Sequence, residues 1–376
     1  MIEASSSSAI APPQGLAPWL QTQLASLLEQ RGHAWLLYGP SGLGQFDLAL
    51  ALAKAWLCEQ LAADGACGHC GSCHAVDVHT HADLCMLMPE TLSMKLGWPL
   101  DEKTQDDLDS KKRKPSKEIK VDAARDAVSF TQFTRSRGTT KVVVVFPAER
   151  MNHITANTLL KTLEEPPGAV KFILATEAAH QLLPTIRSRC LGHAMVWPGF
   201  EEALFWVNTE LVRRNSANES SKKLAHPVDP TDIRTLLIGA GGRPDDALTW
   251  AQNSLPHDAA QHWQALPKAM ARGDVSALAD WTPATAVNAL QKLCHDMWAV
   301  RVGAFPRFFS IEDLPGHQLD KAAASGQPGH IRSELHALAD WSKDLNSIAR
   351  TVEHPYNPGL LMESLVSRAH AALNAH

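Results

Sequence analysis

The segment from Gly39 to Phe46 has the spacing of a phosphate-binding loop but lacks its two reactive side chains. A working loop reads G-x-x-x-x-G-K-[ST]: the backbone N–H groups hold phosphate, the lysine neutralises it and the hydroxyl binds Mg²⁺. Gly39, Gly42 and Gly44 supply the tight turns. Gln45, however, stands at the lysine position and Phe46 at the hydroxyl position. We therefore expect no ATP hydrolysis, and either weak nucleotide binding through the backbone or an inherited fold element that binds none.

A second element of phosphate chemistry is also missing. The β-branched run Lys141–Phe146 predicts a buried strand, and in an ATPase such a strand ends in an acidic pair that positions Mg²⁺. Phe146 and Pro147 stand where that pair is expected, and neither side chain ligates a metal. Glu149 lies too far along the chain to replace them. Two separate losses of the same chemistry indicate that this chain does not hydrolyse ATP.

Four cysteines have the spacing of a metal site. Cys58, Cys67, Cys70 and Cys73 are arranged as C-x8-C-x2-C-x2-C within 16 residues. Two-residue gaps let neighbouring thiolates converge on one tetrahedral ion, for which Zn²⁺ is the usual occupant. Four thiolates leave no open position, so we expect a structural zinc rather than a catalytic one. The alternative is a set of four reduced, buried cysteines, and we expect the remaining three cysteines to be free thiols.

Two arginines lie close together after the last predicted strand, in the segment Arg187-Ser188-Arg189-Cys190. In most proteins such a pair is surface charge. The alternative is an arginine finger, which reaches into a neighbouring subunit and neutralises the γ-phosphate of its ATP in the transition state. A planar, permanently charged guanidinium suits that task better than a lysine.

The elements that position these residues follow from the hydrophobic pattern. Short apolar runs predict strands at Ala34–Tyr38, Lys141–Phe146 and Val170–Thr176. Helical patterns lie between them at Gln45–Leu61 and Ile154–Glu165, the second ended by two prolines. Because strands alternate with helices, the sequence predicts an α/β domain built on a parallel sheet.

The rest of the chain divides by composition. We expect residues 1–15 to be disordered and residues 16–198 to form the α/β domain. Within that domain, residues 89–118 show no period, carry a run of basic residues and predict a flexible surface insertion, either simply solvated or in contact with DNA or a partner. From residue 199 onward the pattern is helical, which predicts a small helical domain over 199–255 and a second helical domain over 256–376.

Composition limits the class of protein. The chain has 376 residues and a formal net charge of −5, so any contact with DNA must come from a local patch rather than from bulk charge. We find neither an export signal nor an apolar stretch of about 20 residues, and we expect a cytoplasmic protein without a membrane span. In that compartment the cysteines are not expected to form disulfides.

Taken together, the motifs resemble a known family. The degenerate loop at 39–46, the cysteines at 58–73, the string LLKTLEEPP at 159–167 and the string RSRC at 187–190 occur in the order and spacing of the bacterial clamp-loader subunits, an AAA+ family. The resemblance covers about residues 15–250. The C-terminal part fits only by position and helical character.

The resemblance carries specific expectations. It implies an AAA+ domain with a zinc module, a helical lid domain over 199–255 and a helical collar domain over 256–376. It implies a pentamer with delta and gamma/tau subunits that loads a sliding clamp onto primed DNA. It assigns Arg189, preceded by Ser188, as the arginine finger acting in trans. The gamma/tau ATPases also keep a sensor-2 arginine, where this sequence has Asp245, with Arg243 as a weaker alternative.

Three rival interpretations remain open. The first is an active gamma/tau-type ATPase with an unusual loop, against which the residues at positions 45, 46, 146 and 147 argue. The second is a zinc-dependent nucleic-acid-binding protein, against which the acidic pI and the α/β pattern argue. The third is a pure scaffold, in which Arg189 can be replaced without effect.

Overall fold

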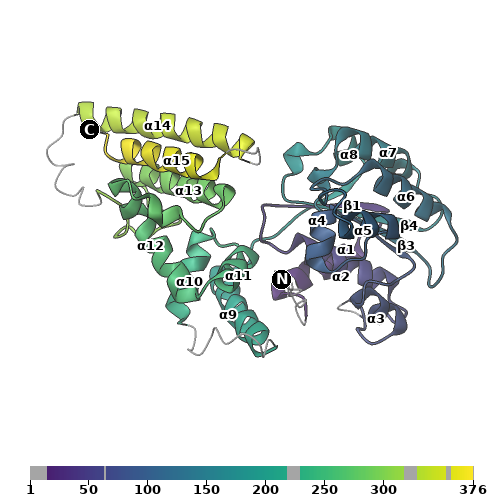
Figure 1. The fold of residues 1–376 in the computed structure, drawn as a ribbon. Coiled ribbons are helices and arrows are strands. Elements are labelled where there is room, and N and C mark those ends of the chain that lie inside the picture. The colour runs from purple at the N-terminus through teal and green to yellow at the C-terminus, as the bar shows by residue number, and fades with distance from the viewer. Residues whose placement is uncertain (1–14, 63–64, 218–228, 317–327, 353–356, 376) are drawn as a thin grey trace. The chain divides into compact units, whose positions relative to one another are not determined.

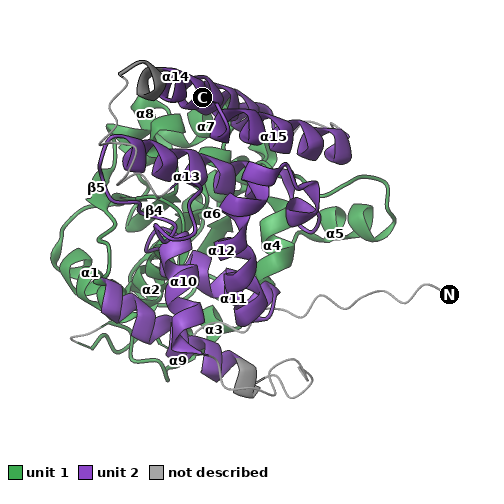
Figure 2. Cartoon of the chain, turned by 90° about the vertical axis from the view of Figure 1, so that its left-hand side faces the viewer, with its two compact units in different colours: residues 1–199 green, residues 200–376 purple. Residues whose placement is uncertain are grey.

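The computed structural model describes residues 15–62, 65–217, 229–316, 328–352 and 357–375. The expected disordered segment at 1–15 lies outside these residues, apart from Gly15. The chain divides into two compact units, residues 1–199 and 200–376 (Figure 2). Among the described helices, none is both long and apolar enough to cross a membrane.

Unit 1 is built on a parallel sheet, as the sequence predicted. Its five strands are β1 (Ala34–Tyr38), β2 (Leu84–Leu87), β3 (Lys141–Val145), β4 (Val170–Thr176) and β5 (Leu191–Ala194). They lie in the order β2-β3-β4-β1-β5, and each neighbouring pair is parallel. The three predicted strands are confirmed, while β2 and β5 were not predicted.

Helices cover both faces of this sheet (Figure 1). Those of unit 1 are α1 (Pro18–Glu29), α2 (Gln45–Leu57), α3 (Gly71–Asp77), α4 (Glu90–Leu96), α5 (Glu102–Asp109), α6 (Val121–Gln132), α7 (His153–Glu164) and α8 (Pro184–Arg187). Leu36, Val143 and Phe172 share one core with apolar residues of α6 and α7. Helix α2 packs on β3 and β4, and alternate strand residues point to opposite faces. Strand β3 is therefore fully buried, which is why it reads as an uninterrupted run of valines.

Local signals set the ends of the two helices that the sequence predicted. Helix α7 begins after Asn152, whose side chain accepts the N–H of Thr155 at 2.9 Å, and it ends just before the two prolines. The prediction for α2 was too long. That helix ends at Leu57 because Cys58 adopts an extended conformation and starts the cysteine segment.

The expectation that residues 89–118 lack a regular period is wrong, because α4 and α5 form there. Helix α5 is capped by Asp101, whose carboxylate accepts the N–H of Thr104 at 2.9 Å. The periodicity was hard to see because α5 buries none of its residues and presents no apolar face.

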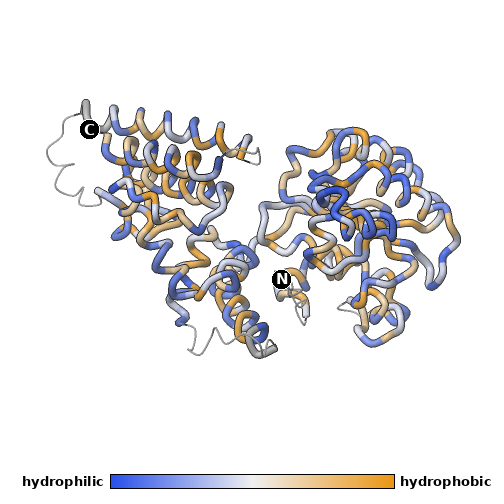
Figure 3. The backbone as a smooth tube through the Cα atoms, in the orientation of Figure 1, coloured by the Kyte–Doolittle hydropathy of each residue, from blue (hydrophilic) through white to orange (hydrophobic). Residues whose placement is uncertain are grey.

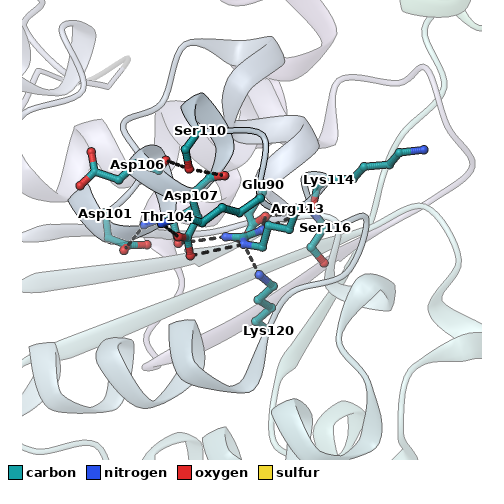
Figure 4. A network of polar contacts seen from close by, with 11 residues as sticks. Glu90, Asp101, Thr104, Asp106, Asp107, Ser110, Arg113, Lys114, Ser116 and Lys120 are labelled. Atoms are coloured by element: carbon teal, nitrogen blue, oxygen red, sulfur yellow. Dashed lines mark hydrogen bonds and ion pairs between the residues drawn. The ribbon is translucent and has the colours of Figure 1, made fainter.

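A buried carboxylate fixes the end of this insertion (Figure 4). Glu90 pairs with Arg113 at 2.5 Å and with Lys120 at 2.6 Å, and it accepts the N–H of Ser116 at 2.8 Å. Burial alone would raise the pKa of Glu90, but these charged and polar donors outweigh it and hold the pKa at about 2. Part of the basic run is therefore an internal anchor, while Lys111, Lys112 and Lys114 stay exposed.

Unit 2 is helical, as predicted. Its helices are α9 (Phe200–Ala217), α10 (Pro230–Gly239), α11 (Pro244–Asn253), α12 (Pro256–Arg272), α13 (Pro283–Arg301), α14 (Pro328–Thr351) and α15 (Pro358–Leu373). Hydrophobic and hydrophilic residues alternate along them (Figure 3). One core joins α9, α10, α11 and the start of α12, a second joins the rest of α12 to α13, α14 and α15, and Trp250 packs against both. The change of core falls near the predicted boundary at residue 255, but both cores belong to one compact unit.

The tryptophans of unit 2 serve mainly as core residues. Trp263 stacks on Phe309 with ring centroids 4.3 Å apart, and its indole N–H donates to the carbonyl of Phe308 at 2.9 Å. Trp341 is also buried in the larger core. These rings are packed inside the protein and are not free to stack on nucleic-acid bases.

Candidate functional site: phosphate loop, cysteine cluster and arginine

The phosphate loop joins β1 to α2, as the sequence predicted. Gly42 and Gly44 adopt positive φ values of 78° and 88°, a conformation that favours glycine. Gly39 is required for a different reason, because a Cβ there would lie 2.9 Å from the Cβ of Met195. The backbone path of a nucleotide-binding loop is therefore present.

The side chain of Gln45 is used to brace this loop. Gln45 is only 2% exposed, and its Nε2 donates to the carbonyl oxygens of Gly39 at 3.1 Å and Pro40 at 2.6 Å. A lysine at this position would instead direct an ammonium group at the phosphates. The neutral amide closes the loop on itself and offers no charge to a nucleotide.

Two phenylalanines meet where the metal ligands of an ATPase would meet. Phe46 is the second residue of α2, and Phe146 follows the last residue of β3. Their ring centroids lie 5.2 Å apart, with the planes inclined at 38°. The structure thus brings together the two positions that the sequence identified separately. Aromatic carbon occupies them in place of a hydroxyl and a carboxylate.

Glu149, the nearest remaining carboxylate along the chain, is already bound by protein donors. Its Oε2 accepts the hydroxyl of Thr176 at 2.6 Å, and its Oε1 accepts the N–H of Glu177 at 3.2 Å. Thr176 is the last residue of β4. Because both carboxylate oxygens are engaged at the end of that strand, Glu149 does not replace the missing acidic pair.

The four cysteines converge, as their spacing predicted. The Sγ atoms of Cys58, Cys67, Cys70 and Cys73 all lie within 4.8 Å of one another. The Cys58–Cys70 and Cys67–Cys73 Sγ pairs are each 3.9 Å apart. Four sulfurs around one tetrahedral zinc, with Zn–S bonds of about 2.3 Å, would be separated by roughly 3.8 Å. The donor set and its dimensions therefore fit such an ion.

Backbone N–H groups point at the sulfurs of this cluster. The N–H of Cys67 donates to Sγ of Cys58 at 3.3 Å, and the N–H of Cys73 donates to Sγ of Cys70 at 3.4 Å. Burial raises the pKa of the Cys70 thiol, but the Cys73 N–H and its other donors outweigh it and lower the pKa to about 6. Glu59 joins the two arms of the cluster by accepting the hydroxyl of Ser72 at 2.9 Å.

Arg189 lies just beyond α8 and is held by its own chain. Its Nε donates to Oε1 of Glu164 at 2.6 Å, and its Nη2 contacts the same oxygen. Its Nη1 donates to the carbonyl of Thr185 at 2.8 Å, an oxygen that also accepts the hydroxyl of Ser188. The Arg189 side chain is 30% exposed and that of Glu164 is 48% exposed. The guanidinium is therefore oriented while one side stays open to solvent.

The arginine and the phosphate loop lie at opposite edges of the sheet. Leu191 pairs with Trp35 near the start of β1, and Arg189 precedes Leu191 by two residues. The phosphate loop instead follows Tyr38, at the far end of β1. With a rise of about 3.3 Å per residue, the length of β1 alone separates the two edges by about 13 Å.

Sequence reasoning missed two partners. It did not identify Glu164 as the partner of Arg189, although an acidic residue at the end of α7 was a usable signal. It also did not predict that the Gln45 side chain would donate hydrogen bonds to its own loop.

In the segment expected to correspond to sensor 2, Arg243 forms an ion pair with Asp246 at 3.0 Å within unit 2.

Comparison with known proteins adds independent information. Residues 17–195 match the family model described as "DNA polymerase III, delta subunit". DNA polymerase III subunit delta' of Pseudomonas aeruginosa is 39% identical over 60% of this chain and 58% of its own length. The Escherichia coli K12 subunit delta' is 28% identical over 92% of this chain and 97% of its own length. Subunit tau of the same E. coli strain is 33% identical, over 59% of this chain and 29% of its own length.

Proposed function

We propose that this chain, whose residues 17–195 match the delta subunit family model of DNA polymerase III and which is similar to delta' subunits, is the non-catalytic delta' subunit of a clamp loader. In this role it helps to load the sliding clamp onto primed DNA during replication. Its partners are delta and gamma/tau subunits in a heteropentamer in the cytoplasm.

The observation that carries the non-catalytic assignment is the Phe46–Phe146 contact, together with the Gln45 bonds to its own loop. Mg²⁺ and the γ-phosphate need charged or oxygen-bearing side chains, and the loop offers carbon and a neutral amide at those places. The alternative, an active gamma/tau-type ATPase, is weaker for this reason. The tau match also covers 59% of the chain, whereas the Escherichia coli delta' match covers 92%.

Arg189 is the residue through which this subunit acts on ATP, according to the proposal. Because Arg189 and the phosphate loop of its own chain lie at opposite edges of the sheet, a nucleotide that it contacts must belong to another subunit. An arginine supplied in trans stabilises the charge that develops on the transferred phosphoryl group. Ser188 contributes by holding the turn that carries the arginine.

Glu164 is the positioning residue for this arginine. It binds the Nε edge of the guanidinium and restricts its orientation. A guanidinium has five N–H donors in a fixed plane, so an arginine held along one edge still presents donors along another. The pair is partly exposed, so it costs little to rearrange when a phosphate approaches.

The four cysteines hold a structural zinc in this proposal. The ion would join the segment after α2 to α3, and its closed thiolate shell supplies no open site for catalysis. In the same proposal the helices of unit 2 form the lid over 199–255 and the collar over 256–376, the collar being the oligomerisation surface.

The proposal is tested by reconstituting the loader from its own organism's delta and gamma/tau subunits, with and without this chain. We expect clamp loading onto primed DNA to require the chain, and the chain alone to show no ATP hydrolysis. Robust hydrolysis by the purified chain would favour the gamma/tau alternative. Full clamp loading by a complex that lacks this chain would contradict the proposed role.

A further inference from the structure

Unit 1 contains a cationic pocket that neither the phosphate loop nor the arginine uses. It has a volume of about 610 Å³ and lies at the amino ends of β3 and β4. Residues 131–138, Lys141 and residues 167–170 line it. Three of these lining residues are basic, namely Arg135, Arg137 and Lys141, and none is acidic. The pocket is therefore suited to an anion.

Lys141 is the central observation. It is only 4% exposed, although a buried ammonium is costly unless it is paired. Its Nζ donates to the carbonyl of Phe130 at 2.7 Å and lies 4.2 Å from the ring centroid of Phe130. Within the described part of the chain, none of the ion pairs includes it. An ammonium has three N–H donors, so this group keeps donors for an anion that enters the pocket.

The two arginines are anchored, and the ion pair that Arg137 makes is a long one. Arg135 donates from Nη1 to the carbonyl of Thr139 at 2.5 Å, and the backbone N–H of Arg137 donates to the buried carboxylate of Asp83 at 2.7 Å. The Arg137 guanidinium reaches Glu59 only at 3.9 Å. The loop is thus fixed by the Arg135 side chain and the Arg137 backbone, while both guanidinium groups remain largely exposed.

An aromatic ring at the same pocket indicates which anion fits. Phe133 lines the pocket and is 70% exposed, and Lys141 Nζ lies 6.0 Å from its ring centroid. Exposed aromatic rings beside basic groups bind single-stranded nucleic acid, because the ring stacks on a base while the cations bind phosphate. Gly138 and Gly168 leave the pocket walls open, since a Cβ on either would meet nothing within 4 Å.

We propose that this pocket binds a nucleotide unit of single-stranded DNA, with the phosphate held by Lys141, Arg135 and Arg137 and the base against Phe133. It supplies the local basic patch that an acidic chain needs for any DNA contact. The proposal goes beyond the role of Arg189 and does not depend on it, because it concerns binding by the full chain alone.

The test is fluorescence anisotropy of a labelled oligothymidylate with the full-length chain over a range of salt concentrations. The double variant Arg135→Gln/Arg137→Gln should bind at least fivefold more weakly. It should also reduce the slope of log affinity against log salt by about 1.4, as expected for two lost contacts to a single strand. Phe133→Ser should weaken binding by about tenfold through the loss of one stacked base.

The matched control is Lys111→Gln/Lys112→Gln, which removes the same two charges from exposed positions outside the pocket. We expect it to leave both affinity and salt slope nearly unchanged. An equal loss in both double variants, or no binding by the native chain at low salt, would overturn the proposal.

Competition with dTMP, inorganic phosphate and hexaglutamate shows whether the pocket prefers a nucleotide, free phosphate or an acidic peptide. Displacement by dTMP in preference to phosphate supports the proposal, and stronger displacement by the acidic peptide contradicts it.

Discussion

Phe46 and Phe146 pack ring against ring, 5.2 Å apart, at the junction of the phosphate loop and the end of β3. Phe46 lies in the first turn of α2 and Phe146 follows β3, so the contact joins the two elements that would hold Mg²⁺ in an active ATPase. This apolar contact therefore involves both of the positions at which an active ATPase would bind the metal. Restoring a metal-binding side chain at only one of these two positions should therefore restore little nucleotide binding.

The first prediction concerns nucleotide binding. We expect calorimetric titration of the native chain with Mg-ATP to show no Mg²⁺-dependent binding, because Gln45 and Phe46 stand at the positions of the lysine and the hydroxyl. Gln45→Lys/Phe46→Ser should gain at most weak binding, since Phe146 still occupies the acidic position. Adding Phe146→Asp should make that binding depend on Mg²⁺. Tight, Mg²⁺-dependent binding by the native chain would contradict this account.

The second prediction concerns the cysteine cluster. We expect the purified chain to contain about one zinc per molecule by plasma mass spectrometry. Cys67→Ser should reduce this content to near zero and lower the thermal midpoint, because the segment between α2 and α3 loses its cross-link. Cys85→Ser, which changes a cysteine outside the cluster, should keep the metal. Equal zinc content in the two variants would exclude the cluster as the binding site.

The third prediction concerns pH. The pKa of Glu90 is lowered from its usual value of about 4.5 to about 2, so the ionised carboxylate favours the folded state. Its contribution to stability is complete above pH 4.5 and is lost as the pH falls towards 2. Glu90→Gln should lower the free energy of unfolding in urea by about 1–2 kcal/mol at pH 7. The difference from the native chain should shrink between pH 5 and 3.

Glu118→Gln is the control for that experiment, because it removes an exposed carboxylate from the same segment. It should change the free energy of unfolding by less than about 0.5 kcal/mol. A Glu90 variant as stable as the native chain at pH 7 would mean that Arg113 and Lys120 do not anchor the insertion.

The sequence predicted the parts of this structure that depend on local pattern. The apolar runs located β1, β3 and β4, and the cysteine spacing located a cluster whose sulfurs do converge. Prediction from the sequence failed where tertiary contacts determine the structure. Strand β5 is mostly exposed and has no apolar run, and α5 has no buried face, so neither showed a period. The Glu164–Arg189 pair joins residues 25 positions apart, which no local pattern records.

The fourth prediction concerns that pair. In the reconstituted loader, Glu164→Gln should lower kcat for DNA-stimulated ATP hydrolysis about three- to tenfold and leave the KM for ATP unchanged. Its effect should vanish in an Arg189→Ala background, because a positioning residue acts only through its partner. The adjacent Glu165→Gln serves as the control and should have little effect. Additive losses in the double variant would show that Glu164 acts independently of the arginine.

The fifth prediction tests the central claim, that Arg189 acts on the ATP of a neighbouring subunit. The measurement is DNA-stimulated ATP hydrolysis by the complete loader with the native chain, with Arg189→Ala or with Arg187→Ala. Arg187 is the matched control, since it is an exposed arginine two positions away. An arginine finger contributes a factor of about 10³ or more at a single site, but the other ATP sites of the complex would dilute that loss.

We predict that Arg189→Ala lowers the hydrolysis rate of the assembled complex several-fold, while Arg187→Ala and the native chain remain alike. Gel filtration must show intact assembly for all three. An unchanged rate with Arg189→Ala in an intact complex would contradict the account and leave the chain as a scaffold.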